Sequence, residues 1–111
     1  MLRITLLAVL SAASAASWHS DFKSAGQAAR ESGKPLLVDF QALWCYSCYF
    51  MEQHVLEKPG FLSAAQGLVL AKLDVDTEEG RRLRDEHRAN FMPSYLILSS
   101  EGREIGRIVG E

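Results

Sequence analysis

The sequence predicts a single α/β domain in which a mixed β-sheet is flanked by helices. Helical and extended patterns alternate along most of the chain, which is typical of parallel strands joined by helices. Two short apolar runs then follow each other closely, as in an antiparallel hairpin. The chain has 111 residues, of which 48% are hydrophobic and 23% charged, so it can form one core but has no room for a second module.

Residues 1–16 have the layout of a secretory signal peptide. One basic residue precedes an apolar stretch over residues 4–10, and a run of small residues follows. We expect the mature chain to begin near Ala16 or Ser17, which leaves a domain of residues 17–111 in the periplasm or another extracytoplasmic compartment. A membrane anchor is the alternative, but the apolar stretch is far shorter than the roughly 20 residues that span a bilayer.

The charge of the chain gives no reason to expect nucleic acid as a partner. Lys and Arg number 12 and Asp and Glu number 14, so the formal net charge is -2. Such a balance does not attract nucleic acid or an anionic membrane surface. We therefore expect the partners to be proteins.

The first elements of the domain are a helix and a buried strand. A helix is expected over residues 21–32, with Ser20 as its cap and Gly33 as its stop. After a Lys-Pro break, residues 36–40 form a nearly unbroken apolar run, the pattern of a central strand that is buried on both faces. Asp39 is the anomaly within this run.

The remaining elements complete the alternation and add the hairpin. They are expected as a helix from the cysteines through Val55, a short helical piece over 61–66, a strand over 68–75, a helix capped by Thr77 that runs to about His87, and strands over 95–98 and 104–109. Pro59 ends the second helix. Gly102 suits the turn of the hairpin.

Cys45 and Cys48 stand three positions apart where the second helix begins. In the first turn of a helix this spacing puts both sulfurs on one face, so that they can bond or separate with little backbone movement. Free backbone N–H groups and the helix dipole stabilise a thiolate at Cys45 and lower its pKa below the ordinary value of about 8.5. Cys45 is the candidate nucleophile, and Cys48, one turn inward and more shielded, is the candidate resolving thiol.

Two other interpretations of the cysteine pair compete with a redox role. A structural disulfide usually links distant segments, because closing so short a loop constrains the unfolded chain little. A zinc site would need four ligands and would have to recruit two of His19, His54 and His87, none of which stands at zinc-finger spacing. The redox role requires neither a metal nor an organic cofactor.

The segment over residues 38–48, Val-Asp-Phe-Gln-Ala-Leu-Trp-Cys-Tyr-Ser-Cys, resembles the active-site strand and helix of the thioredoxin family. It is most similar to the exported branch that includes the C-terminal domain of the transmembrane reductase DsbD, where a hydrophobic-acidic helix like Tyr-Phe-Met-Glu at 49–52 also follows the second cysteine. The resemblance covers roughly residues 20–110 and implies a thioredoxin-like fold. It also implies a protein-disulfide reductase that acts on disulfide-containing proteins and receives electrons from another dithiol protein, for which a membrane-bound donor is a candidate.

The resemblance implies roles for two charged residues. Asp39 matches the buried acid that accepts and returns a proton as the resolving cysteine reacts, and burial in an apolar strand should raise its pKa. An acid at the exposed end of the strand is the alternative. Lys72 matches the lysine that lies near this acid, although a lysine in a strand is ordinarily exposed to solvent.

The resemblance also implies a substrate-binding surface. Pro93 matches a proline that follows a cis peptide bond beside the cysteines, and the backbone of Met92 could then pair with an extended substrate segment. A trans proline that opens a strand is the alternative. Trp44 is expected to flank the site and offer an apolar contact, unless it packs in the core. Tyr46 and Ser47 bring no positive charge between the cysteines, which favours a reductant or exchange catalyst over a strong oxidant.

One departure from the family concerns the end of the chain. Thioredoxins continue past the glycine matched by Gly110 into a final helix that covers part of the sheet, and this sequence lacks it. We expect a bare sheet face, and interpret the sequence as a fragment rather than as a domain whose face a partner covers. Two other functions stay open: a metal-binding or metal-delivery module that uses both thiolates, and a redox-inactive interaction protein.

Overall fold

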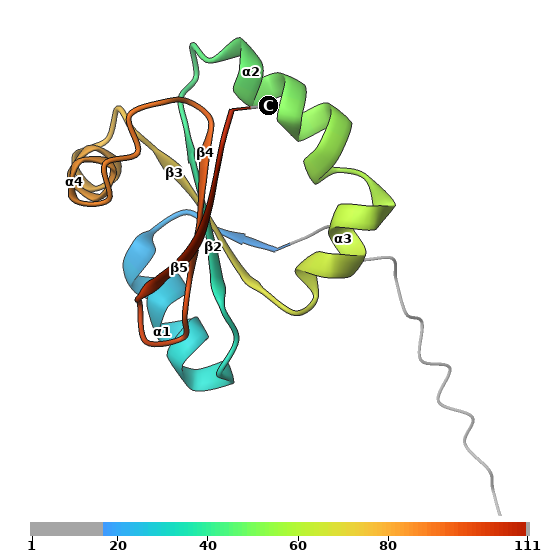
Figure 1. Cartoon of the computed structure of the whole chain (residues 1–111), viewed down its shortest axis with the longest axis vertical. Helices are drawn as coiled ribbons and strands as arrows, with labels where there is room; N and C mark the ends of the chain where they lie inside the picture. Colours follow the sequence, from blue (N-terminus) through green and yellow to red (C-terminus); the bar gives the residue numbers. More distant parts are fainter. Residues whose placement is uncertain (1–16, 111) are drawn as a thin grey trace, which may run out of the picture.

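The computed structural model describes residues 17–110 and consists of a five-stranded mixed sheet with helices on both faces (Figure 1). The predicted signal peptide lies outside the described residues. The strands are β1 (Trp18–His19), β2 (Leu36–Gln41), β3 (Val69–Asp74), β4 (Ser94–Leu98) and β5 (Glu104–Val109). The helices are α1 (Phe22–Ser32), α2 (Tyr46–Met51), the π-helical turn η1 (Glu52–Leu56), α3 (Pro59–Ala65) and α4 (Glu78–Glu86).

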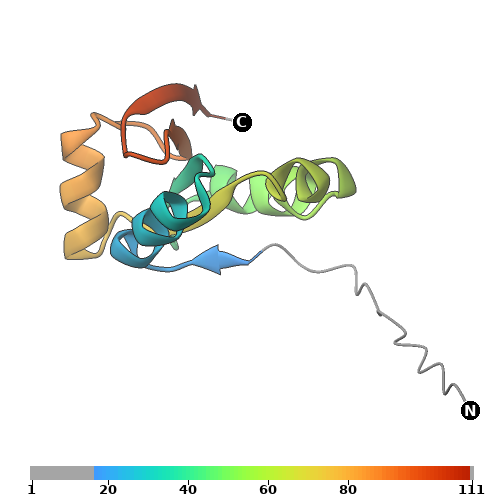
Figure 2. The same ribbon diagram turned by 90° about the horizontal axis from the view of Figure 1, so that it is seen from below.

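The sheet has the strand order β1-β3-β2-β4-β5, with the first three strands parallel and β4 and β5 antiparallel. The two edge strands, β1 and β5, lie at opposite sides of the molecule (Figure 2). The predicted α/β architecture with a mixed sheet is therefore confirmed. None of the helices in residues 17–110 has the length and apolar character to cross a membrane.

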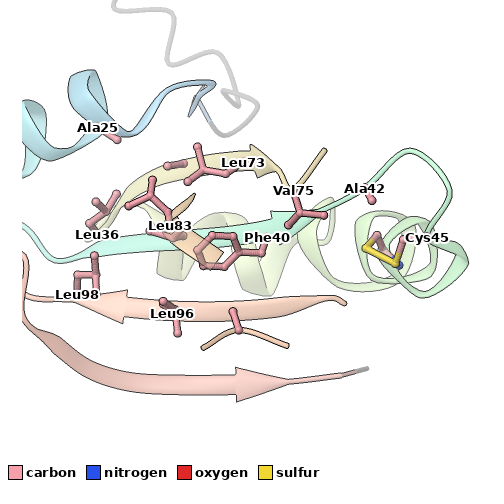
Figure 3. Packing of buried hydrophobic residues seen from close by; sticks show 14 of the residues in the cluster. Ala25, Leu36, Phe40, Ala42, Cys45, Leu73, Val75, Leu83, Leu96 and Leu98 are labelled. Carbon is pink, nitrogen blue, oxygen red and sulfur yellow. A yellow bond between two sulfur atoms is a disulfide. The ribbon is translucent and has the colours of Figure 1, made fainter. Parts of the chain in front are cut away.

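β2 is the central strand, and its side chains alternate between two hydrophobic clusters. Val38 and Phe40 belong to the cluster on the face covered by α1 and α4, where Phe40 packs among side chains of several elements (Figure 3). Leu37 belongs to the cluster on the other face, under η1 and α3. Because side chains alternate along a strand, Asp39 shares the face of Leu37. The buried strand predicted from the apolar run is confirmed.

The helix ends follow from capping side chains. The cap of α1 is Asp21 rather than the predicted Ser20, because its carboxylate accepts hydrogen bonds from both the backbone N–H and the hydroxyl of Ser24. Gly33 ends this helix in the left-handed conformation, as predicted. Thr77 caps α4 as predicted, accepting from the backbone N–H of Gly80 at 3.1 Å.

Two features of the helices and strands differ from the prediction. The helix after the cysteines is not uniformly α-helical, because α2 passes into the π-helical turn η1 before α3 begins at Pro59. The short strand β1 was not predicted. It pairs with β3 at Leu70 and Ala71, and the ring of Trp18 stacks on Phe61 of α3 with centroids 6.1 Å apart. Packing against β3 and α3, rather than a pattern within two residues, makes this segment a strand.

The predicted hairpin of β4 and β5 is confirmed. Gly102 lies in its turn with a φ of 94°, a conformation that favours glycine. β5 is the last element of residues 17–110, and its side chains Ile105, Ile108 and Val109 are exposed. These exposed apolar side chains lie along one edge of the sheet.

Candidate active site

Cys45 and Cys48 form a disulfide at the N-terminus of α2, just beyond the end of the central strand (Figure 3). Cys45 is the N-cap residue, and the two Cα atoms are 5.2 Å apart. The backbone N–H of Cys48 donates to the Sγ atom of Cys45 at 3.1 Å. A sulfur that accepts such a bond is stabilised as a thiolate once the disulfide is reduced, which agrees with Cys45 as the nucleophile.

Burial does not distinguish the two cysteines. Their exposed fractions are 5% for Cys45 and 7% for Cys48. The expectation that Cys48 is the more shielded of the two is therefore wrong for the disulfide form. Both side chains pack into the cluster that contains Ala42, because the loop after β2 folds back over the core. The two sulfurs differ instead in position, since Cys45 accepts a backbone hydrogen bond as the helix cap.

Local hydrogen bonds hold the loop that presents the cysteines. The backbone N–H of Cys45 donates to the carbonyl of Ala42 at 3.2 Å, which makes a tight turn between strand and helix. The hydroxyl of Tyr49 donates to the carbonyl of Leu43 at 2.8 Å and ties the helix back to this loop. The cysteine pair is thus placed on a short, fixed connection at the carboxyl end of β2.

Asp39 is a buried acid on the face of the sheet that η1 and α3 cover. Its exposed fraction is 2%, so the alternative of an exposed strand end is wrong. Burial raises its pKa to about 7, against the opposing effect of the positive charge of Lys72 and with a smaller contribution from the negative charge of Glu52. The raised pKa predicted from the apolar strand is confirmed. Its Oδ1 atom has no hydrogen-bond partner among residues 17–110.

Lys72 lies beside Asp39 but forms its ion pair with another acid. The two residues are partners in the β2–β3 register. The Nζ atom of Lys72 lies 2.7 Å from both carboxylate oxygens of Glu52 on η1 and 4.5 Å from the ring centroid of Trp18. The lysine is partly buried rather than exposed. Two residues of this site were not predicted from the sequence. One is Glu52, and the other is Tyr95, which is paired with Asp39 in the β2–β4 register.

The three residues predicted to bind substrate lie around the cysteines in different ways. The Met92-Pro93 peptide bond is cis, so the trans alternative is wrong. Met92 packs against the cluster that contains both cysteines. Trp44 is 63% exposed, which excludes core packing, and its indole Nε1 atom donates to Oδ2 of Asp76 at 2.9 Å. An exposed Phe91 stands next to Met92 in the same loop.

The histidines are not gathered at the cysteines. His54 lies exposed on η1 and stacks on Phe50, with ring centroids 4.3 Å apart. Among residues 17–110, no three His, Cys, Asp or Glu side chains lie together in a way that could hold a metal ion. In the described part of the chain, the histidines therefore do not combine with Cys45 and Cys48 into the zinc site considered as an alternative above.

A family model described as thioredoxin-like matches residues 17–100. The chain belongs to the thioredoxin-like family. It is 39% identical over 88 residues to thiol:disulfide interchange protein DsbD 2 of Pseudomonas aeruginosa, in a match that covers 76% of this chain but only 15% of that protein. It is 34% identical over 93 residues to an H-type thioredoxin of Fagopyrum esculentum, covering 84% of this chain and 72% of the relative.

Solved structures agree with this assignment. A thioredoxin from Thermus thermophilus superposes on 87% of this chain and 77% of its own, with a TM-score of 0.78 and 28% sequence identity. Both the thioredoxin-like fold and the resemblance to DsbD are thereby confirmed. The chain is a member of a family of thiol-disulfide oxidoreductases, and it carries the paired cysteines of that chemistry at Cys45 and Cys48.

Proposed function

We propose that this thioredoxin-like domain is an extracytoplasmic protein-disulfide reductase. The observation that carries the proposal is the Cys45–Cys48 disulfide at the start of α2, with a backbone N–H directed at the sulfur of Cys45. A reversible disulfide at a helix N-terminus is the arrangement that lowers the pKa of one thiol and makes it reactive. Neither a metal nor an organic cofactor takes part.

In the proposed reaction, two electrons pass from the reduced cysteine pair to a substrate disulfide. The thiolate of Cys45 attacks one substrate sulfur, the substrate disulfide breaks, and the released substrate thiolate takes up a proton. Cys48 then loses its proton and attacks Sγ of Cys45. The mixed disulfide breaks, the second substrate thiol leaves, and the Cys45–Cys48 disulfide forms.

Asp39 is proposed to carry the proton of this second step. A carboxylate can accept the proton of Cys48 and a carboxylic acid can return it, and a pKa of about 7 makes both forms available near neutral pH. Its place on β2, the strand that leads directly into the loop that carries the cysteines, supports this role. Lys72 is proposed to limit the rise of the pKa of Asp39 through its positive charge.

Substrate is proposed to lie across the loop of the cis-proline and the segment before Cys45. An extended segment would pair with the backbone of Met92, held in place by Pro93, and contact the exposed ring of Trp44. Disulfide-containing proteins are the substrates we propose. A second dithiol protein then donates electrons and reduces the Cys45–Cys48 disulfide again. The signal-like residues 1–16 support a periplasmic or secreted location.

Reduction of insulin by dithiothreitol tests the proposal. The intact protein should accelerate insulin precipitation, and Cys45→Ser should abolish the acceleration because no nucleophile is left. Cys48→Ser should instead accumulate the mixed disulfide. The control His54→Ala, which changes an exposed side chain on η1, should keep the full rate. Absence of acceleration by the intact protein would refute the proposal and favour a redox-inactive scaffold.

A glutathione titration tests the direction of electron flow. A reductant should show a reduction potential near about -270 mV, the value typical of thioredoxin, whereas a potential near about -120 mV is typical of a strong oxidant. Binding of copper or zinc in equal amount to the protein, lost in Cys45→Ala, would favour the metal-delivery alternative instead.

A further inference from the structure

Asp39 and Tyr95 are buried polar side chains on neighbouring strands of the sheet. They stand opposite each other in the β2–β4 register, and residues in such a pair point to the same face. The exposed fraction of Tyr95 is 4% and that of Asp39 is 2%. Within the described part of the chain, neither the Oη atom of Tyr95 nor the Oδ1 atom of Asp39 has a hydrogen-bond partner. A buried donor and a buried acceptor thus come from paired positions on one face of the sheet, and no hydrogen bond joins them.

An unpartnered buried hydroxyl calls for a physical reason. Buried phenols normally find a hydrogen-bond partner, and leaving one without a partner destabilises the fold. The ring of Tyr95 packs in the cluster under η1 and α3, and a phenylalanine would fill that space without this cost. A buried hydroxyl of this kind calls for a state of the site in which it has an acceptor.

The charged groups that act on Asp39 are paired with each other, and neither is hydrogen-bonded to Asp39. Lys72 from β3 and Glu52 from η1 are the charged groups whose fields act on Asp39. Lys72 is already held by both carboxylate oxygens of Glu52. α2 and α3 bring no acidic or basic side chain to this face, and the residue of β5 paired with Tyr95 is Ile108.

We propose that the hydroxyl of Tyr95 is the hydrogen-bond donor that the Asp39 carboxylate takes when it gives up its proton. One bridging water, or a shift of the two side chains toward each other, brings the O–H to the carboxylate, and the hydrogen bond stabilises the negative charge. Tyr95 is in this sense a positioning residue for Asp39, and the inference rests on the proposed reductase mechanism. The phenol stays protonated throughout, because burial and the nearby acids Asp39 and Glu52 raise its pKa.

The test is a pH titration of the Asp39 carboxyl carbon by NMR in the wild type and in Tyr95→Phe. Removing the donor should raise the pKa of Asp39 by at least about one pH unit, since hydrogen bonds to charged groups are among the stronger ones. The matched control is Tyr46→Phe, which deletes a hydroxyl from a residue that is 90% exposed and should leave the titration unchanged. An unchanged or lowered pKa of Asp39 in Tyr95→Phe would overturn the proposal.

Further measurements separate this proposal from a packing role and from the proposed function. A packing role would lower the free energy of unfolding of Tyr95→Phe without moving the titration of Asp39. The titration does not depend on catalysis. If the pKa of Asp39 shifts in Tyr95→Phe but the wild type does not reduce insulin, only the reductase function is refuted. If Tyr95→Phe does not fold, the Cζ resonance of Tyr95 in the wild type must show a step at the midpoint of Asp39, and its absence would overturn the proposal.

Discussion

Asp39 shows how one buried residue can be useful for chemistry and costly for stability. Burial raises its pKa from the ordinary value of 3.8 to about 7 in the folded state. Between these two pH values the folded state binds the proton and the unfolded state does not. The contribution of Asp39 to the free energy of unfolding is therefore fully present below about pH 4. It is lost as the pH rises from about 4 to about 7, and above pH 7 it does not change further.

Asp39→Asn should therefore stabilise the protein in a pH-dependent way. The amide cannot ionise, so the gain in the free energy of unfolding over the wild type should grow by about 2 to 3 kcal/mol between pH 5 and pH 8. Urea denaturation of the oxidised forms at both pH values measures the two gains. An equal gain at pH 5 and pH 8 would show that Asp39 is already ionised in the folded protein at pH 5.

At this scale the sequence predicts residues that act through local patterns and misses those that act across the sheet. The cysteine spacing and the acid within an apolar run were visible along the chain. Glu52 and Tyr95 join the site through a contact between η1 and β3 and through the β2–β4 register, and neither is encoded by neighbouring residues. Asp76 holds the indole of Trp44 in the same long-range way.

At the scale of elements, the junction of β3 and α4 depends on a glycine in a close approach. Gly80 lies in the first turn of α4, and a Cβ atom added there would stand 1.9 Å from the carbonyl oxygen of Asp74. That carbonyl also accepts the hydroxyl of Thr77, the cap of the helix. The end of β3 and the start of α4 therefore cannot move apart without breaking the hydrogen bond from Thr77 to Asp74.

Gly80→Ala should therefore destabilise the protein by more than about 2 kcal/mol, because the contact is with backbone rather than with a flexible side chain. The same change at Gly60, inside α3 with nothing within 4 Å of an added Cβ, should stabilise it by about 0.5 to 1 kcal/mol through helix propensity. Thermal unfolding of both variants measures the difference. Equal effects would mean that α4 can shift away from β3 freely.

Elements were predicted where a segment carries its own signal. Capping residues and apolar runs gave α1, β2, α4 and the hairpin close to their observed bounds. The strand β1 has two residues, too few for an alternating pattern, and its pairing with β3 comes from tertiary packing. The π-helical turn η1 has no signature in spacing, and it became visible only in the backbone hydrogen bonds.

At the scale of the described molecule, residues 17–110, most of the exposed large apolar side chains belong to two groups. One surrounds the cysteines: Leu43, Trp44, Tyr46, Tyr49, Phe50 and Phe91. The other is the edge strand β5, with Ile105, Ile108 and Val109. The first region coincides with the proposed substrate surface. The second lies on β5, which has no further strand beside it within residues 17–110, and exposed apolar side chains on such an edge promote pairing between chains.

Ile105→Lys, at an exposed position of β5 that is not paired with Tyr95, should reduce self-association of residues 17–111 without changing the active site. A charge on an exposed edge strand disfavours pairing with a second copy, since its burial would be costly. Sedimentation velocity at rising protein concentration should show a smaller association for this variant than for the wild type, with insulin reduction unchanged. Val55→Lys, which places the same charge on an exposed position of η1, is the matched control and should associate like the wild type. Equal association of all three proteins would show that β5 is protected by its twist and its polar neighbours Glu104 and Arg107 rather than open to pairing.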